Sequence, residues 1–326
     1  MSARLAANAV RSLATVAALA SAAPALAQSA PRWLVVSDEP GNRLVLLSAA
    51  TGQMVDSVAI GGRPRGMALS PDGRRVYVAL GNDDAVAVFD VRSRRVVERI
   101  PVGKDPEQVA LSPNGARAYV SNEEIARATA VDVATKRVRF TSPVGTEPEG
   151  VGVAPNGRKI YVTGESDSSV TVLDASTGRR ITRFAVGSRP RFVVFTRDGA
   201  RAFVSAENGG TVTYVDARAD TVVGAVTIGN RTTRPTGLAL SPDEKTLYLA
   251  NGRANEVAII DVESRSVSAT IPVGERPWGI TLSRDGRTLY TANGRSGSVS
   301  VIDVSSRRVT QTLTVGGRPY TVLLVP

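Results

Sequence analysis

The 326-residue chain contains no cysteine and no histidine. A Ser-His-Asp or Cys-His nucleophile system is therefore excluded. Haem attachment through a C-x-x-C-H motif is excluded as well, as are zinc or copper sites built from thiolate or imidazole ligands. Only carboxylates, lysine, tyrosine, serine, threonine and arginine remain for catalysis. Without disulfides, the fold must be stable through its core alone, which is within reach of a domain of this size.

Long apolar runs are also missing, and aromatic residues make up only 5% of the chain. At the N-terminus, Arg4 and Arg11 precede a short apolar stretch over 13–20, and small residues follow up to Ala27. This order is typical of a secretory signal peptide. The alternative, a membrane-anchoring helix, needs about 20 apolar residues. We therefore expect a signal peptide over 1–27, cleavage after Ala27, no membrane span, and a periplasmic or secreted protein over 28–326.

Seven X-Pro dipeptides, each followed by a short apolar run, divide the chain at nearly constant intervals. The intervals are 42, 42, 42, 45, 42 and 42 residues, and the prolines are Pro64, Pro106, Pro148, Pro190, Pro235, Pro277 and Pro319. Strand-like repeats with a period of about 40–45 residues are typical of a β-propeller.

One repeat shows four strand-like segments. In the unit from Gly62 to Val102 we predict strands over 66–70, 75–79 and 85–90, a loop over 81–84, and a fourth strand from Val96. Turns of the S-P-D-G type separate the first two strands, and they recur with the same rhythm. The same spacing repeats an aromatic residue in the second strand (Tyr77, Tyr119, Tyr161, Phe203, Tyr248, Tyr290) and an aspartate ending the third (Asp90, Asp132, Asp174, Asp216, Asp261, Asp303).

The two ends complete the count. Residues 318–325 form a first strand with nothing after it, whereas residues 33–60 hold the other three strands and lack a first. We therefore predict an all-β, seven-bladed β-propeller with four antiparallel strands per blade, in which the last blade is closed by the N- and C-terminal strands together.

At this level the chain resembles the YVTN-type β-propeller repeat proteins over about residues 32–326. The resemblance rests on Tyr290-Thr291-Ala292-Asn293, Ser70-Pro71-Asp72-Gly73 and Val301-Ile302-Asp303. Three further segments resemble the exported β-propellers associated with PQQ-dependent alcohol catabolism; they are Arg276-Pro277-Trp278-Gly279-Ile280, Gly252-Arg253-Ala254-Asn255 and Ser121-Asn122-Glu123-Glu124. This resemblance implies an accessory role in alcohol oxidation.

The residues beside the prolines form the candidate site. Since each proline opens an innermost strand, its neighbours are expected to ring the mouth of the central channel. The candidate ligand-binding residues are Arg63, Arg65, Arg189, Arg191, Arg234, Arg276, Trp278, Arg318 and Tyr320. Guanidinium groups bind carboxylates and phosphates through two parallel hydrogen bonds, which suits a small anion or a quinone carboxylate. The alternative is that these arginines pair with Asp105, Glu107, Glu147 and Glu149 across the channel, or with neighbouring loops.

The outer loops of the same face are acidic on one side and carry Arg253 and Arg295 on the other; the acidic residues are Asp38, Glu39, Asp83, Asp84, Glu123, Glu124, Glu165, Asp167 and Glu207. Calcium takes such carboxylates, but no D-x-D-x-D-G loop is present and we predict no metal site. A charge distribution of this kind also suits docking of a periplasmic redox protein. A three-residue insertion over 230–233 adds Arg231 to this face or reflects drift in a loop.

The opposite face carries basic turns without interleaved aromatic residues, so we predict solvated turns and no nucleic-acid partner. We predict a monomeric, non-catalytic binding or scaffold protein with no catalytic residues and no cofactor, whose partner is a redox protein or a small anion. The alternative is a propeller lactonase that uses carboxylates and a metal. A quinoprotein dehydrogenase would need a cofactor pocket and an electron exit that the sequence does not show.

Overall fold

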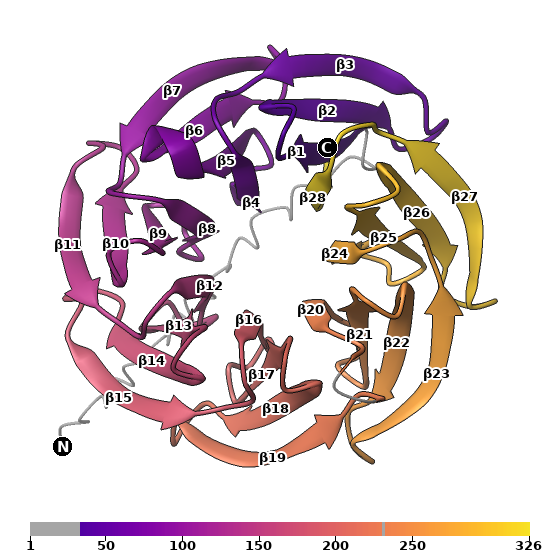
Figure 1. Ribbon diagram of the computed structural model, residues 1–326. Helices are drawn as coiled ribbons and strands as arrows, with labels where there is room; N and C mark the ends of the chain where they lie inside the picture. Colours follow the sequence, from indigo (N-terminus) through magenta and orange to yellow (C-terminus); the bar gives the residue numbers. More distant parts are fainter. Residues whose placement is uncertain (1–32, 230–231) are drawn as a thin grey trace, which may run out of the picture.

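A computed structural model describes residues 33–229 and 232–326, which form a closed ring of seven four-stranded antiparallel sheets (Figure 1). The signal peptide predicted over 1–27 and the predicted contribution of Arg231 lie outside the described residues. Among the residues described, no helix is long and apolar enough to cross a lipid bilayer. The predicted seven-bladed propeller is confirmed.

Blades 1 to 6 run outward from the channel in sequence order. Blade 1 holds β4 (Pro64–Leu69), β5 (Arg75–Leu80), β6 (Ala85–Asp90) and β7 (Arg95–Pro101), with the short 3-10 helix η1 (Gly81–Asp83) between β5 and β6. Blade 2 holds β8 (Pro106–Leu111), β9 (Arg117–Asn122), β10 (Arg127–Asp132) and β11 (Val138–Pro143). Blade 3 holds β12 (Pro148–Val153), β13 (Lys159–Gly164), β14 (Ser169–Asp174) and β15 (Arg180–Ala185).

The remaining blades repeat this order. Blade 4 holds β16 (Pro190–Phe195), β17 (Arg201–Ala206), β18 (Thr211–Asp216) and β19 (Thr221–Thr227). Blade 5 holds β20 (Pro235–Leu240), β21 (Thr246–Asn251), β22 (Glu256–Asp261) and β23 (Ser266–Pro272). Blade 6 holds β24 (Pro277–Leu282), β25 (Thr288–Asn293), β26 (Ser298–Asp303) and β27 (Arg308–Thr314).

Blade 7 joins the two ends of the described chain. Its inner strand β28 (Pro319–Val325) pairs with β1 (Trp33–Asp38), and β2 (Arg43–Ser48) and β3 (Met54–Ala59) follow outward. Trp33 lies opposite Val325 in the antiparallel register, and Asp38 lies opposite Pro319. The predicted closure by N- and C-terminal strands is confirmed, and it removes the free edge that an open ring would leave.

The prolines fit the first position of the innermost strands because a proline has no backbone N–H to donate and its φ is compatible with extended structure. The strand predicted over 66–70 therefore starts two residues earlier, at Pro64, and ends at Leu69. Ser70 belongs to the following turn, where its hydroxyl donates to Asp72 at 2.6 Å and accepts from the Arg75 N–H at 2.9 Å.

The core is divided into seven apolar clusters, one at each joint between neighbouring blades. The second-strand aromatic residues contribute to these clusters, and Tyr119, Tyr161 and Phe203 are among the largest fully buried side chains. Tyr161 packs edge-on against Phe195 of the next blade, with ring centroids 4.9 Å apart. Since every blade packs against two neighbours, the ring holds the loops at the channel mouth in fixed positions.

Candidate functional site: an arginine pocket beside a compensated charge network

The chain enters each innermost strand through a strained residue. The residue before the proline has a positive φ of 47° to 59° in blades 1 to 6, at Arg63, Asp105, Glu147, Arg189, Arg234 and Arg276. This conformation is uncommon for residues with a side chain. In blade 7 the positive φ of 57° moves back to Gly317, so Arg318 enters β28 by a different backbone path.

One arc of the channel mouth is a network of arginines paired with glutamates. Arg191 is 4% exposed, and its guanidinium contacts Glu165 at 2.6 Å, Glu207 at 2.6 Å and Glu149 at 3.0 Å. Arg189 contacts Glu165 and lies 3.3 Å from Glu207. Both arginines are therefore compensated by carboxylates from blades 3 and 4.

The network continues into blades 1 and 2. Arg65 contacts Glu107 and lies 3.5 Å from Glu149, while its guanidinium carbon sits 4.5 Å from the centre of the Tyr320 ring. The Tyr320 hydroxyl donates to Glu149 at 2.8 Å. Buried charges are tolerated when they are paired in this way, and removal of one partner is strongly destabilising.

Two buried glutamates of the network, Glu107 and Glu149, differ in acidity. Burial, together with repulsion from Glu149, raises the pKa of Glu107 well above its ordinary range. Burial also opposes ionisation of Glu149, but the attraction of Arg191 and Arg65 and the hydrogen bond from Tyr320 outweigh it and lower its pKa. Glu149 therefore supplies the fixed negative charge at the centre of the network.

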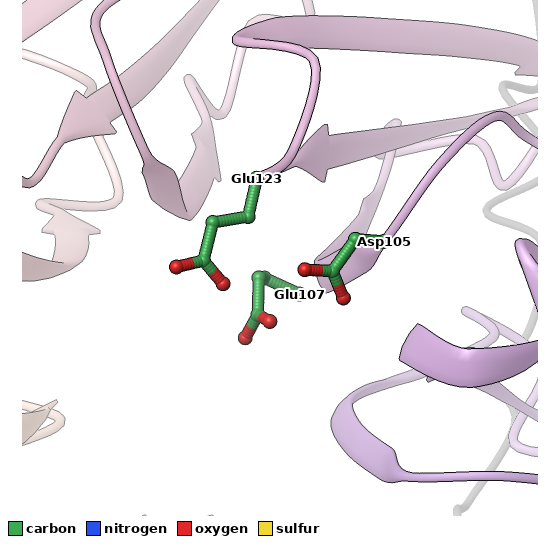
Figure 2. Close-up of side chains that lie close together, drawn as sticks. All are labelled: Asp105, Glu107 and Glu123. Atoms are coloured by element: carbon green, nitrogen blue, oxygen red, sulfur yellow. The ribbon is translucent and has the colours of Figure 1, made fainter.

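Three carboxylates at the edge of the network lie close enough to hold a cation. Oxygen atoms of Asp105, Glu107 and Glu123 lie within 4.8 Å of one another, and Figure 2 shows the three side chains converging. Arg63 contacts both Asp105 and Glu107 and lies 3.7 Å from Glu123. The Arg63 guanidinium thus already supplies the positive charge that a calcium ion would otherwise bring to oxygen ligands of this kind.

The opposite arc holds a pocket of about 880 Å³ at the mouth of the channel, over blades 5, 6 and 7. Six arginines and only two glutamates line it; they are Arg65, Arg234, Arg253, Arg276, Arg295 and Arg318, with Glu39 and Glu275. We call this cavity the arginine pocket. Its volume is within the range of about 300–1,000 Å³ that is common for small-molecule sites.

The arginine pocket lies over two of the three blades that lack a repeated carboxylate, blades 5 and 6. The residue that directly follows the second strand is glutamate in four blades and glycine in three; the series is Glu39, Gly81, Glu123, Glu165, Glu207, Gly252 and Gly294. In every blade its N–H donates to the carbonyl of the residue before the proline, at 2.8–3.2 Å. This backbone hydrogen bond is therefore common to all seven blades, whereas the side chain differs.

The next residue in the same loops reinforces the difference. It is arginine in blades 5 and 6, at Arg253 and Arg295, and neutral or acidic in the other blades. Within the described residues, Arg253, Arg295 and Arg318 make no side-chain hydrogen bond or ion pair, and all three are exposed. Arg234 and Arg276 share one oxygen of Glu207, at 3.3 Å and 3.0 Å. The pocket consequently carries excess positive charge.

Two aromatic residues form the floor of the pocket. Trp278 and Tyr320 are each 7% exposed, and their ring centroids lie 5.2 Å apart. Arg276 stands 4.9 Å from the Trp278 ring centre. The buried Trp278 Nε1–H finds no acceptor among the described residues. Such a donor is costly to leave unpaired, so a water or a ligand atom near the floor would stabilise it.

The structure divides the predicted ligand-binding residues into two groups. Arg234, Arg276, Trp278, Arg318 and Tyr320 line the arginine pocket, and Arg65 lies between the pocket and the network. Arg63, Arg189 and Arg191 instead pair with carboxylates, as the alternative interpretation described. Of the acidic partners named there, Glu147 differs, because its carboxylate contacts the Ser166 hydroxyl and no arginine within the described residues.

The sequence analysis missed the role of Glu207, Gly252 and Gly294. The signal was present, because these residues occupy one register position of the repeat together with Glu39, Gly81, Glu123 and Glu165. Aligning the blades on the residue after the second strand would have located the pocket.

Comparison with known proteins gives a partial family match. Residues 174–322 match the model of the family described as Lactonase, 7-bladed beta-propeller. The matched segment runs from the end of β14 to within β28. It contains Arg234, Arg253, Arg276, Arg295 and Arg318 of the arginine pocket, whereas Glu39 and Arg65 lie outside it. No curated protein matches the chain.

Solved structures share the fold at low sequence identity. Hydrazine synthase from Kuenenia stuttgartiensis is 24% identical with a TM-score of 0.76, over 84% of this chain and 93% of that one. A protein of unknown function from Desulfotomaculum acetoxidans is 17% identical with a TM-score of 0.78, over 90% and 99%. A candidate 6-phosphogluconolactonase from Bacteroides fragilis is 18% identical with a TM-score of 0.76, over 90% and 98%. These likenesses establish the seven-bladed propeller fold.

Proposed function

We propose that the protein binds a small organic anion in the arginine pocket. The observation that carries this proposal is that Arg253, Arg295 and Arg318 line one cavity without a carboxylate partner among the described residues. Unpaired guanidinium groups around a concave, partly apolar site are suited to carboxylate or phosphate recognition. Arg63, Arg189 and Arg191, which are paired with carboxylates, lie outside the lining of the pocket.

The setting of this binding protein belongs to the same proposal. The N-terminal sequence predicts export to the periplasm or the medium, and the resemblance stated above implies an accessory role in PQQ-dependent alcohol oxidation. A small anion from such metabolism, or PQQ itself, would carry the carboxylates that the pocket is suited to bind. A redox protein docking on the asymmetrically charged face is the competing partner.

A ligand screen tests the proposal. Thermal unfolding would be measured in the presence of PQQ, organic acids, lactones and calcium, because a ligand of the native state raises the unfolding temperature by mass action. We expect organic anions to raise it and calcium to leave it unchanged. If no anion changes the unfolding temperature, the pocket is not an anion site and a protein partner becomes the better explanation.

Two variants connect any binding to the pocket. Arg276→Ala and Arg318→Ala should each lower the affinity for the anion by about 10-fold to 100-fold, since a hydrogen bond to a charged group contributes about 1.5–3 kcal/mol. Arg287→Ala is the matched control, because Arg287 lies in the β24–β25 turn of blade 6, on the opposite face. Unchanged affinity in the two pocket variants would remove the pocket from the proposal.

Lactone hydrolysis is a second candidate function, favoured by the family match over residues 174–322. In this function a carboxylate at the rim, Glu39 or Glu275, would accept a proton from the attacking water, and the arginines would stabilise the developing oxyanion. Acid release from aldonolactones would be followed with and without EDTA, and in Glu39→Gln and Glu275→Gln. Hydrolysis no faster than in buffer would exclude the candidate, and hydrolysis that persists in EDTA and in both variants would exclude the carboxylate-and-metal form.

A further inference from the structure

We infer that the arginine pocket selects anions with at least two anionic groups over anions with one. This inference rests on the proposed function and specifies the class of ligand. The class is an organic di- or tri-anion whose charged groups are carboxylates or phosphates, attached to a body small enough for a cavity of about 880 Å³.

Positive charge remains uncompensated inside the pocket. Arg65 is compensated by Glu149 and Glu39, and Arg234 and Arg276 share Glu207. Arg253, Arg295 and Arg318 remain without an ion pair within the residues described. Glu275 lies at the rim and is exposed, where solvent weakens its interaction. A single negative charge would therefore leave cations facing each other across the cavity.

These three arginines are distributed around the pocket. Arg253 lies in the β21–β22 loop of blade 5, Arg295 in the β25–β26 loop of blade 6, and Arg318 directly before β28 of blade 7. Their backbones belong to three different blades. A carboxylate held in a bidentate pair by the arginine of one blade is not also placed for a bidentate pair with the arginines of the other two blades. Two or three anionic groups on one body can reach separate blades at once.

The pocket also has room for the uncharged body of a ligand. Gly252 and Gly294 leave the wall of the pocket without side chains at the positions where other blades carry glutamate. The floor below is formed by Trp278 and Tyr320. An uncharged ligand body can therefore lie against the glycine wall and the aromatic floor, while its charged groups point to the arginine rim.

A graded series of ligands tests the inference by isothermal titration calorimetry. Propionate, succinate and tricarballylate carry one, two and three carboxylates on a short aliphatic chain, and 2-phosphoglycerate carries a phosphate and a carboxylate. We expect the dissociation constant to fall at least 10-fold from propionate to succinate and again to tricarballylate. Tighter binding of 2-phosphoglycerate than of succinate would identify phosphate as the preferred group, and the reverse order would identify carboxylate.

Variants attribute the charge dependence to the pocket. Arg295→Gln should reduce the ratio of the propionate and tricarballylate dissociation constants at least 10-fold. Arg287→Gln, on the opposite face, should leave this ratio unchanged. Equal affinities across the series would overturn the inference and leave the proposed anion-binding function standing. Failure of all four probes, together with no response in the broader screen, would overturn the proposed function itself.

Discussion

Restoring the missing carboxylate should close the arginine pocket. Gly294 occupies the register position that is glutamate in four other blades, and its N–H makes the same hydrogen bond, to Arg276 O at 2.8 Å. A Cβ at this position would meet Pro319 O at 3.4 Å and Arg318 Cγ at 3.6 Å, which are near-ordinary contacts. Its φ lies outside the left-handed region, so Gly294→Glu should fold as the wild type does.

The expected effect follows from the equivalent pair in blades 3 and 4. There, Glu165 contacts Arg189, the arginine before the next proline. The new carboxylate of Gly294→Glu would stand in the same relation to Arg318 and would compete with the ligand. Because Arg318 would then be withdrawn from the ligand, the loss is that of a hydrogen bond between charged groups, about 1.5–3 kcal/mol. A loss of about 10-fold to 100-fold in anion affinity is expected.

The assay is calorimetric titration with tricarballylate at two salt concentrations. Gly294→Ala is the matched control, because it adds the Cβ without the charge and should keep affinity within about 2-fold of the wild type. Weakened binding in both variants would mean that space, not charge, makes the pocket. Wild-type affinity in Gly294→Glu would refute the argument that the absent carboxylate creates the site.

Three further predictions concern the network and the ring. Glu149→Ala removes the hydrogen-bond acceptor of Tyr320 and an ion-pair partner of Arg191, and should lower the free energy of unfolding in urea by about 3–5 kcal/mol. The control Glu275→Ala should lower it by less than about 0.5 kcal/mol. A loss below about 1 kcal/mol in Glu149→Ala would contradict the stabilising role of the network. Burial raises the pKa of Glu165 to about 7, so its proton stabilises the native state below about pH 4.5 and this contribution is lost as the pH rises to about 7. Between pH 4.5 and 8, the free energy of unfolding of Glu165→Gln should therefore rise relative to that of the wild type, by up to about 3 kcal/mol. A difference between the two proteins that does not change with pH would show that the arginine partners of Glu165 govern its ionisation. Deleting residues 319–326 removes β28 and leaves β1 without its inner neighbour, so urea unfolding followed by circular dichroism should lose its single cooperative transition.

The sequence was sufficient for the fold because local signals repeat seven times. A proline, a turn and an aspartate each identify a strand boundary by a chemical requirement that acts within a few residues. Asp90 illustrates this, since it accepts hydrogen bonds from the N–H and the hydroxyl of Ser93, three residues later. Such requirements can be read from one repeat and checked against the others.

The charge pairings could not be read in the same way, because they join residues of different blades. Arg276 reaches Glu207, 69 positions earlier, and Tyr320 reaches Glu149, 171 positions earlier. Each depends on the curvature of the ring and on the length of the side chains. The sequence placed Arg63, Arg189 and Arg276 at equivalent positions around the mouth of the channel, but it could not show which carboxylates each of them contacts.

An arginine count alone is therefore a poor guide to a site in a ring of this kind. Arg189 and Arg318 occupy the same position of the repeat, directly before the proline, yet Arg189 pairs with Glu165 and Glu207 whereas Arg318 faces a cavity. What separates them is the residue after the second strand of the adjacent blade, glutamate in one case and glycine in the other. Because the backbone hydrogen bond at that residue is the same in every blade, loss of one side chain changes the charge of the mouth without changing the fold. In a repeat protein, anion binding is consequently better indicated by a repeat that lacks the acidic residue present in its neighbours than by the region where arginines are most frequent.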